Sequence, residues 1–361
     1  MSALLEYKCP CCGGAITFDS TLQKMKCPYC DTEFEVETLK AYDDDLKKEG
    51  ADELKWTSDT ASEWQEGETD GMRIYVCRSC GGEIIGDDTL AATSCPYCGN
   101  PVVFMGQFGG DLRPDCIIPF ALDKESAKNA YRKHISGKKL LPKPFADENH
   151  IDEIKGVYVP FWLFDAEADG SARFRASRVT SWSDGKYRYT KTDHYSLLRS
   201  GKMSFADIPV DGSTKMPDEL MESIEPYRME EAVDFKTAYL AGYIADRYDV
   251  PSEDCVSRAN ERIKRSVCEA LSGTLGGYTG ITTESESVRL SGGKSRYALC
   301  PVWILNTTWQ GKKYIFAMNG QTGKMVGDLP LDTSTYRRWL FGIAGAVSAV
   351  VFLLSWLMWL F

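Results

Sequence analysis

Hydrophobic residues recur at helical spacing in two segments of this 361-residue chain. Residues 251–273 carry an apolar residue at every third or fourth position, which predicts an amphipathic helix that ends at Gly273. Its apolar stripe consists of Val256, Ala259, Ile263, Val267 and Leu271. Residues 124–135 also have a helical pattern, and Asp123 before them is a candidate N-cap.

Shorter apolar runs predict strands in the same part of the chain. We expect residues 156–170 and 171–182 to form neighbouring strands of a hairpin, and residues 298–327 to form a three-stranded meander. The stretches VYVPFWLF (157–164) and ALCPVWIL (298–305) match each other at a proline and a tryptophan. This match predicts two related β units that pack in one domain.

The last apolar run is the longest, because residues 339–361 contain no charged side chain. As a helix, these residues would span roughly 34 Å, which is enough to cross a bilayer core of about 30 Å. Arg337 and Arg338 precede the run, and positive residues stay on the cytoplasmic side. We therefore expect a single-pass, tail-anchored protein of the inner (cytoplasmic) membrane, with its N-terminal bulk in the cytoplasm.

Two cysteine clusters with identical spacing supply the candidate chemistry. Each follows the pattern C-x2-C-x14-C-x2-C, and the eight cysteines are Cys9, Cys12, Cys27, Cys30, Cys77, Cys80, Cys95 and Cys98. Paired cysteines in a reducing compartment indicate metal, and four thiolates suit a closed tetrahedral Zn²⁺ site. The pattern predicts two structural zinc ions. Redox-active C-x-x-C pairs are the alternative, but they would need a thioredoxin-like βαβ context that this sequence lacks.

The repeat also indicates which cysteines are ligands. Cys11 lies between Cys9 and Cys12 but aligns with Ser79 of the second copy, so we do not expect it to bind metal. Glycines follow the first cysteine pair of each copy, where the turn needs positive φ angles. A site with four protein ligands has no open position, which argues against hydrolytic zinc chemistry.

Charge is distributed unevenly along the chain. The net charge is -10, and residues 35–71 contribute -9 of it through 13 acidic and 4 basic residues. The first ribbon region (1–34) has four acidic and three basic residues, so it lacks the basic stripe that phosphate contacts require. Trp56 and Trp64 are unusual in such a polar stretch, and they either pack against a neighbouring domain or dock a partner.

These patterns predict an α+β protein made of two small four-cysteine zinc ribbons, a larger mixed domain and one transmembrane helix. The expected parts are a first ribbon (1–36), an acidic linker (37–72), a second ribbon (73–105), an α+β domain (115–332) and the membrane helix (339–361).

Sequence motifs of catalysis are missing. The chain has no H-E-x-x-H or G-x-S-x-G motif, and the GGKS at 292–295 lacks the preceding glycine of a phosphate-binding loop. The three histidines share no motif, and the single cysteines Cys116, Cys255, Cys268 and Cys300 have apolar neighbours. We predict that the protein is not an enzyme, and the sequence identifies no small-molecule substrate.

The motifs YKCPCCGGAI and CPYCDTEF resemble zinc ribbons of the transcription factor IIB type. Together with PFALDKESAKNAYRKH, VYVPFWLFDAEADG, LCPVWIL and FAMNGQTGKMVGDLP, they resemble a family of bacterial membrane-anchored zinc-ribbon proteins, whose members often carry primosomal or helicase-like names. This resemblance implies a non-enzymatic membrane protein, often encoded near phage-shock-A-like and flotillin-like proteins.

The function that we expect is a membrane-anchored adaptor. Its partners would be proteins, such as a phage-shock-A-like or flotillin-like scaffold, together with the lipid bilayer. The duplication suggests that both ribbons engage a partner together, which would raise avidity. Two alternatives stay open: a nucleic-acid-binding ribbon protein, which the charge disfavours, and an enzyme with an unrecognised site in the middle domain.

Overall fold

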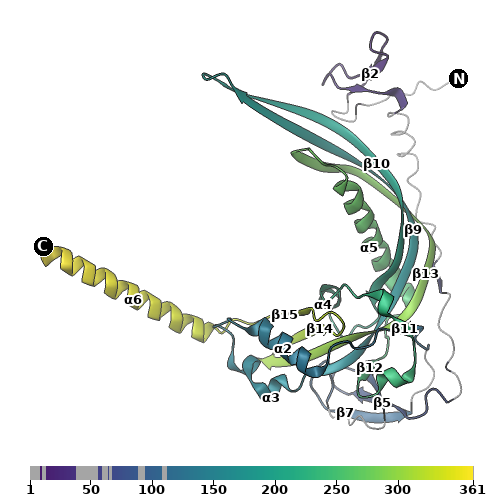
Figure 1. Cartoon of the computed structure of the whole chain (residues 1–361), viewed down its shortest axis with the longest axis vertical. Coiled ribbons are helices and arrows are strands. Elements are labelled where there is room, and N and C mark those ends of the chain that lie inside the picture. Colours follow the sequence, from purple (N-terminus) through teal and green to yellow (C-terminus); the bar gives the residue numbers. More distant parts are fainter. Residues whose placement is uncertain are drawn as a thin grey trace. The chain divides into compact units, whose positions relative to one another are not determined.

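A computed structural model of the chain describes residues 9, 14–37, 56–58, 64, 67–87, 94–107 and 112–360. It confirms a mixed α+β protein with one apolar C-terminal helix (Figure 1). The helices are α2 (Lys124–Ile135), α3 (Glu148–Ile151), α4 (Asp218–Ser223), α5 (Ser252–Gly273) and α6 (Thr333–Leu360), with 3-10 turns η1 (Lys143–Ala146), η2 (Met229–Glu231) and η3 (Thr237–Leu240).

The strands form two separate sheets. Strands β1 (Thr17–Asp19), β2 (Lys24–Lys26) and β3 (Glu33–Phe34) make a small antiparallel sheet. The larger sheet has the order β11-β8-β13-β9-β12-β6-β5-β7, with β10, β14, β15 and β4 attached to it. Its strands are β4 (Thr57–Ser58), β5 (Met72–Cys77), β6 (Glu83–Asp87), β7 (Val102–Gln107), β8 (Cys116–Ile117), β9 (Lys155–Ser183), β10 (Arg188–Asp211), β11 (Val233–Asp234), β12 (Ile244–Asp246), β13 (Gly280–Trp309), β14 (Lys312–Asn319) and β15 (Met325–Gly327).

The chain divides into two interleaved compact units. The hairpin unit contains Met1–Ser58, Phe164–Ile208 and Val256–Ser295, and the sheet unit contains the rest. Strands β9, β10 and β13 contribute to both. The domain boundaries proposed from composition stay a prediction, and most of the acidic linker lies outside the described residues.

One predicted hairpin is wrong, because residues 156–182 belong to the single strand β9. Burial alternates from Ala166 through Gly170 to Ala172, which is the pattern of a continuous half-buried strand across the predicted turn. Gly170, at the boundary between the two predicted strands, is typical of a turn, but a Cβ atom there would overlap Cγ1 of Val267 in α5. This glycine lets the helix approach the strand closely. The true hairpin partner is β10, after a turn at residues 184–187.

Helix α5 covers the strands of the hairpin unit, as the sequence predicts. Four residues of its apolar stripe, Ala259, Ile263, Val267 and Leu271, are buried, and three of them pack with Phe174 and Leu290 of the strands. Figure 1 shows α5 lying alongside β9, β10 and β13. Trp56 adds to this core through an edge-on contact with Phe164 at 5.0 Å between ring centroids.

The two matching β units are confirmed by equivalent pairings in the sheet unit. Strand β8 runs parallel to β13, and β12 runs parallel to β9. In each β unit the proline carbonyl accepts a hydrogen bond from a glycine N–H. The tryptophan of the β9 unit donates to a carbonyl just before α5, and the tryptophan of the β13 unit donates to a carbonyl just before α2. These bonds are Gly212 to Pro160 (2.9 Å), Gly320 to Pro301 (2.8 Å), Trp162 to Val250 (2.9 Å) and Trp303 to Leu122 (3.1 Å).

Two other predicted elements are confirmed. Asp123 caps α2, because its carboxylate accepts the N–H of Ser126 at 2.8 Å. Strands β13, β14 and β15 form the antiparallel meander expected for residues 298–327.

Helix α6 is long and apolar enough to cross a membrane by length and composition, and none of its apolar window is buried. Asp332 begins it, since its carboxylate accepts the N–H of Ser334 and the hydroxyl of Thr335. The hydrogen bond from Thr335, followed by that from Ser334, lowers the pKa of Asp332 to about 2. The cap therefore keeps its negative charge, which suits a helix N-terminus.

Candidate metal centres

The first cysteine cluster lies at one end of the β1–β3 sheet. The thiols of Cys9, Cys27 and Cys30 all lie within 4.8 Å of one another. Cys12, the predicted fourth ligand, and Cys11 lie outside the described residues. A small core supports the cluster and consists of Cys9, Ile16, Met25, Cys27 and Phe34.

The second cluster is described in full. Cys77, Cys80, Cys95 and Cys98 bring their four thiols within 4.8 Å of one another. Cys77 ends β5, and Cys95 begins the turn that leads into β7. Within the described part of the chain, these two cysteine groups are the clusters of metal-ligating side chains.

All four cysteine turns share one backbone hydrogen bond. In each, the N–H of the first cysteine donates to the carbonyl five residues later, over 2.7 to 2.9 Å. These bonds join Cys9 to Gly14, Cys27 to Thr32, Cys77 to Gly82 and Cys95 to Asn100. The residue before the accepting carbonyl has a positive φ wherever it is described, namely at Asp31 (55°), Gly81 (72°) and Gly99 (73°). The prediction that these turns need glycine is therefore confirmed at Gly81.

The second glycine of each pair has another role. A Cβ on Gly14 would lie 2.5 Å from the ring of Tyr29, and one on Gly82 would lie 3.6 Å from the ring of Tyr97. The tyrosine between the second pair of cysteines thus packs over this glycine in both copies. A cross-strand bridge is also shared, because Lys26 pairs with Glu33 as Ser94 pairs with Pro101.

The thiols fit a tetrahedral ion. Four thiolates at about 2.3 Å from one ion lie about 3.8 Å from one another. The sulfur atoms are separated by 3.6 Å for Cys9 and Cys30, by 3.3 Å for Cys77 and Cys98, and by 3.7 Å for Cys80 and Cys95. The four thiols of the second cluster, and the three described thiols of the first, are therefore close enough together to hold a metal ion.

The surroundings change the proton affinities of several thiols. A hydrogen bond with the Thr32 hydroxyl, at 3.1 Å, is the main reason that the pKa of Cys30 is lowered to about 6. Burial acts to raise the pKa of Cys98, but hydrogen bonds from Asn100 and Cys77 outweigh it and bring it to about 7. Burial raises the pKa of Cys95. Because the thiolate is the ligand form, metal binding would displace protons from the buried cysteines.

The two ribbons differ in what lies against them. Strand β6 of the second ribbon pairs with β12, so this ribbon belongs to the larger sheet. Tyr97 is only 4% exposed and lies among Ile84, Cys77 and Cys95 in the core of the sheet unit. Its counterpart in the first ribbon, Tyr29, is 75% exposed.

Side-chain contacts also fasten the second ribbon to the sheet unit. Arg247 pairs with Glu83 at 2.7 Å, and Lys155 donates to the carbonyl of Ser94 at 2.7 Å. Lys215 lies over the ring of Tyr97, with its ammonium 6.0 Å from the ring centroid. The sequence does not reveal these contacts, because Lys215 and Arg247 are far from the cysteines along the chain.

The remaining candidate residues do not gather into a site. Trp64 packs edge-on against Phe235, with ring centroids 5.7 Å apart, so both linker tryptophans pack against folded parts. His134, His150 and His194 lie on separate elements. Cys255 and Cys300 are buried, as the apolar neighbours predict, whereas Cys116 and Cys268 are partly exposed.

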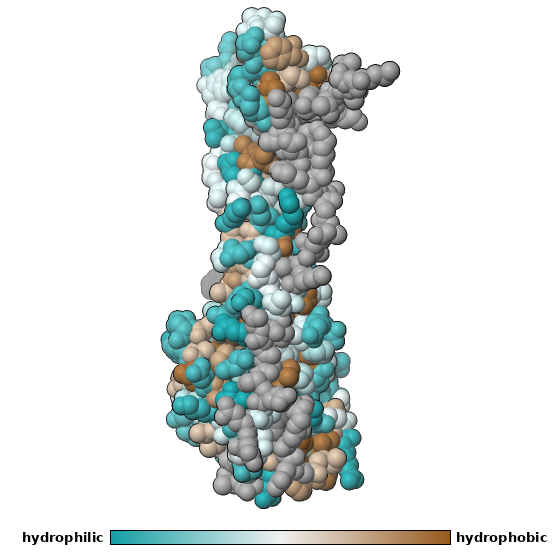
Figure 2. Space-filling model, turned by 90° about the vertical axis from the view of Figure 1, so that its right-hand side faces the viewer, coloured by the Kyte–Doolittle hydropathy of each residue, from teal (hydrophilic) through white to brown (hydrophobic). Residues whose placement is uncertain are grey.

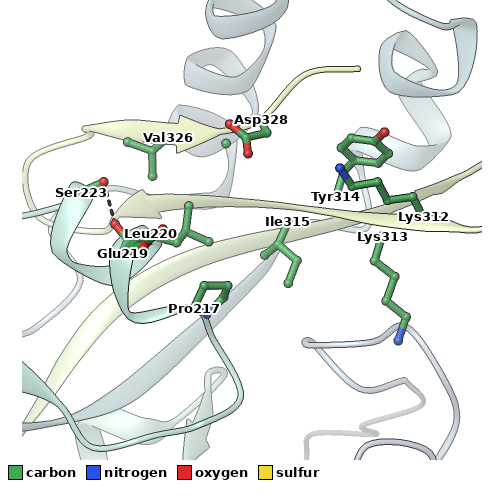
Figure 3. A pocket seen from close by; sticks show the side chains of 11 residues that line it. Pro217, Glu219, Leu220, Ser223, Lys312, Lys313, Tyr314, Ile315, Val326 and Asp328 are labelled. Carbon is green, nitrogen blue, oxygen red and sulfur yellow. Dashed lines mark hydrogen bonds between the residues drawn. The ribbon is translucent and has the colours of Figure 1, made fainter. Parts of the chain in front are cut away.

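A pocket of about 390 Å³ lies between α4 and strands β14 and β15 (Figure 3). Figure 3 shows Lys312 and Lys313 leaving β14 on opposite sides, with Glu219 at the far end near Ser223. The Ser223 hydroxyl donates to the backbone carbonyl of Glu219 at 2.6 Å.

Comparison with known proteins gives one full-length relative. The chain is 35% identical over 355 residues to the uncharacterized protein YdjG of Bacillus subtilis (strain 168), and the alignment covers 98% of each chain. No family model matches the chain. No solved structure matches it either.

Proposed function

The chain belongs to the YdjG family, and we propose that it is a membrane-anchored adaptor that binds partner proteins through a zinc ribbon at the cytoplasmic face of the membrane. Helix α6 would be the anchor. Arg337 and Arg338 in its first turns would keep the remaining chain in the cytoplasm. The ions would be Zn²⁺, since four thiolates in a reducing compartment favour this metal.

The observation that carries this proposal is the exposure of Tyr29. In the second ribbon, the equivalent Tyr97 is buried against the sheet unit, so this face of the ribbon fold is suited to docking. In the first ribbon the same face is open, and Phe18 and Leu22 are exposed as well. Exposed aromatic side chains are enriched at protein interfaces, where they supply much of the binding energy.

Other exposed aromatic residues include Phe104 on β7 and Trp182, Tyr187 and Tyr189 on the β9–β10 hairpin, so the case for the first ribbon rests on its comparison with the second. Figure 2 shows a side of the molecule on which hydrophilic residues dominate and hydrophobic residues form small separate patches. The first ribbon region also lacks an excess of basic residues, which favours a protein over a nucleic acid. The family resemblance suggests a phage-shock-A-like or flotillin-like scaffold as the partner.

Fluorescence localisation of such a scaffold, in cells that carry the full-length chain, tests the proposal. We expect Tyr29→Ala, and deletion of residues 1–34, to reduce recruitment strongly while α6 still inserts. Glu33→Gln is a matched control, because it changes an exposed side chain of the same ribbon. Unchanged recruitment by Tyr29→Ala and by the deletion of residues 1–34 would overturn the assignment to the first ribbon. Salt-sensitive, tight binding of RNA or DNA would favour the nucleic-acid alternative.

A further inference from the structure

The β9–β10 hairpin extends beyond the rest of its unit. Its last contact with the turn that joins α5 to β13 is at Arg178, whose Nε donates to the carbonyl of Gly277 at 3.2 Å. The same guanidinium lies 5.3 Å from the ring centroid of Tyr278. Every residue from 178 to 192 is exposed, and Figure 1 shows the hairpin running past that turn. A two-stranded hairpin that packs against nothing has little stability of its own in water.

Despite this exposure, the hairpin tip (residues 178–192) makes many contacts within itself. The carboxylate of Asp184 accepts the N–H groups of Lys186 and Tyr187 at 3.0 and 2.8 Å, and its other oxygen accepts the hydroxyl of Tyr189 at 2.9 Å. Gly185, with a φ of 93°, completes the turn. These bonds hold aromatic side chains in place where no core requires them.

The aromatic residues of the tip share one face. The rings of Trp182 and Tyr189 stack across the strands with centroids 5.6 Å apart, and Tyr187 lies edge-on to Tyr189 at 6.5 Å. Trp182, Tyr187 and Tyr189 are 52%, 66% and 41% exposed. The opposite face carries Ser181 and Thr190, whose hydroxyl groups lie 3.3 Å apart, and, by alternation along β10, Arg188. Alternation along the two strands separates these faces.

The charge of the tip opposes that of the protein. Residues 178–192 contain four basic residues and one acidic residue, so their net charge is +3. The whole chain has a charge of -10, which leaves -13 for the other residues. The basic residues are Arg178, Lys186, Arg188 and Lys191.

We propose that this hairpin tip binds the surface of an anionic lipid bilayer. Tryptophan and tyrosine prefer the interface between lipid and water, where an apolar ring meets a polar edge. Basic residues at the end of the hairpin, Lys186 in the turn and Arg188 at the start of β10, are attracted to anionic headgroups, and Lys191 lies on the aromatic face. A protein that α6 holds at a membrane would meet such a surface. Single-stranded nucleic acid fits less well, because the stack of Trp182 on Tyr189 occupies ring faces that bases would need.

The test separates the tip from the anchor. The full-length chain is placed in nanodiscs of neutral phosphatidylcholine, which take up α6, and is floated with liposomes. We expect nanodiscs that carry the protein to float with liposomes containing phosphatidylglycerol and not with liposomes of phosphatidylcholine alone. High salt should weaken the association.

Matched variants identify the residues. Lys186→Gln with Arg188→Gln should weaken association by about 30-fold, because each basic residue near an anionic surface contributes about a fivefold factor. Lys312→Gln with Lys313→Gln removes the same charge elsewhere and should have no effect. Trp182→Ser with Tyr187→Ser should weaken association by about tenfold or more, whereas Val179→Ser, on the opposite face, should not.

Three outcomes would overturn the proposal: equal binding to neutral liposomes, no loss in the tip variants, or displacement of the liposomes by single-stranded RNA at stoichiometric amounts. The tip variants should keep the circular dichroism spectrum of the parent protein, because residues 178–192 are all exposed and belong to no hydrophobic core. This control excludes unfolding as the cause of a loss.

Discussion

The two ribbons of this protein have the same cysteine spacing and the same turns but opposite surroundings. The first forms its own three-stranded sheet, and its tyrosine at the second cysteine pair is exposed. The second adds its strands to the larger sheet, and the equivalent tyrosine is buried. The difference shows that one cysteine-ribbon fold can be part of a larger sheet in one place and leave the equivalent tyrosine exposed in another.

This difference separates what each metal ion would stabilise. Cys77 and Cys95 belong to the main core of the sheet unit, together with Val157 and Val302 from its long strands. Cys9 and Cys27 belong to a core whose described members all come from the first ribbon. Binding energy at a structural zinc site is also folding energy. The second ion would therefore stabilise the sheet unit, whereas the first would stabilise only its own ribbon.

The largest expected effect comes from removing one ligand in each ribbon. Cys95→Ser should lower the free energy of unfolding of the sheet unit by roughly 5 kcal/mol or more, because both the metal and a buried core residue are lost. Cys27→Ser should release one zinc and leave the sheet unit folded. Metal analysis together with hydrogen exchange of β9 and β13 would measure both effects. Equal protection of these strands in the two variants would contradict the comparison.

The tyrosine pair should show the same asymmetry on a smaller scale. Tyr97→Ala should lower the free energy of unfolding by about 3 to 5 kcal/mol, the usual cost of emptying a large buried site. Tyr29→Ala should change it by less than about 0.5 kcal/mol, since the ring is mostly in solvent. Urea denaturation of the full-length chain in detergent measures both. A large loss for Tyr29→Ala would mean that this ring supports the fold and is not a free surface.

The sequence predicts the ribbons well because their information is local. Cysteine pairs, the glycine at position 81 and the tyrosine between the second pair all act within about thirty residues. The same holds for α5, whose apolar stripe alone identifies its buried face. The match of Pro160 and Trp162 with Pro301 and Trp303 also identifies two related units.

The sequence fails where the outcome depends on distant partners. Gly170 is typical of a turn until Val267, almost a hundred residues later, is known to lie against it. The burial of Tyr97 likewise depends on β12 and Lys215, while Tyr29 has the same local sequence pattern and stays exposed. The repeat therefore predicts equivalent roles for the two ribbons, but the two equivalent tyrosines differ in exposure.

Zinc release should distinguish the two sites in time. The first ribbon has a small core of its own, so we expect it to open without disturbing the larger sheet and a chelator to remove its ion at least about tenfold faster. A colorimetric zinc indicator should record two phases of equal size. Cys27→Ser should remove the fast phase, and Cys11→Ser should keep both, since Cys11 is not a predicted ligand. A single phase that contains both ions would contradict separate sites.

The smallest effect concerns a backbone position that the two ribbons fill differently. Asp31 and Gly99 each follow a cysteine by four residues, and both have positive φ angles, 55° and 73°. A side chain in this conformation costs about 1 kcal/mol relative to glycine, although aspartate tolerates it better than most residues. Gly99→Asp should therefore destabilise the second ribbon by about 1 kcal/mol. Asp31→Gly should stabilise the first ribbon by a smaller amount, about 0.5 kcal/mol. The gain is smaller because the substitution also removes the exposed ion pair with Lys26 at 3.4 Å, although this pair contributes little. The slow and fast phases of zinc release report the two changes separately. If both substitutions destabilised their ribbons equally, the side chain of Asp31 would have a role that this backbone argument does not contain.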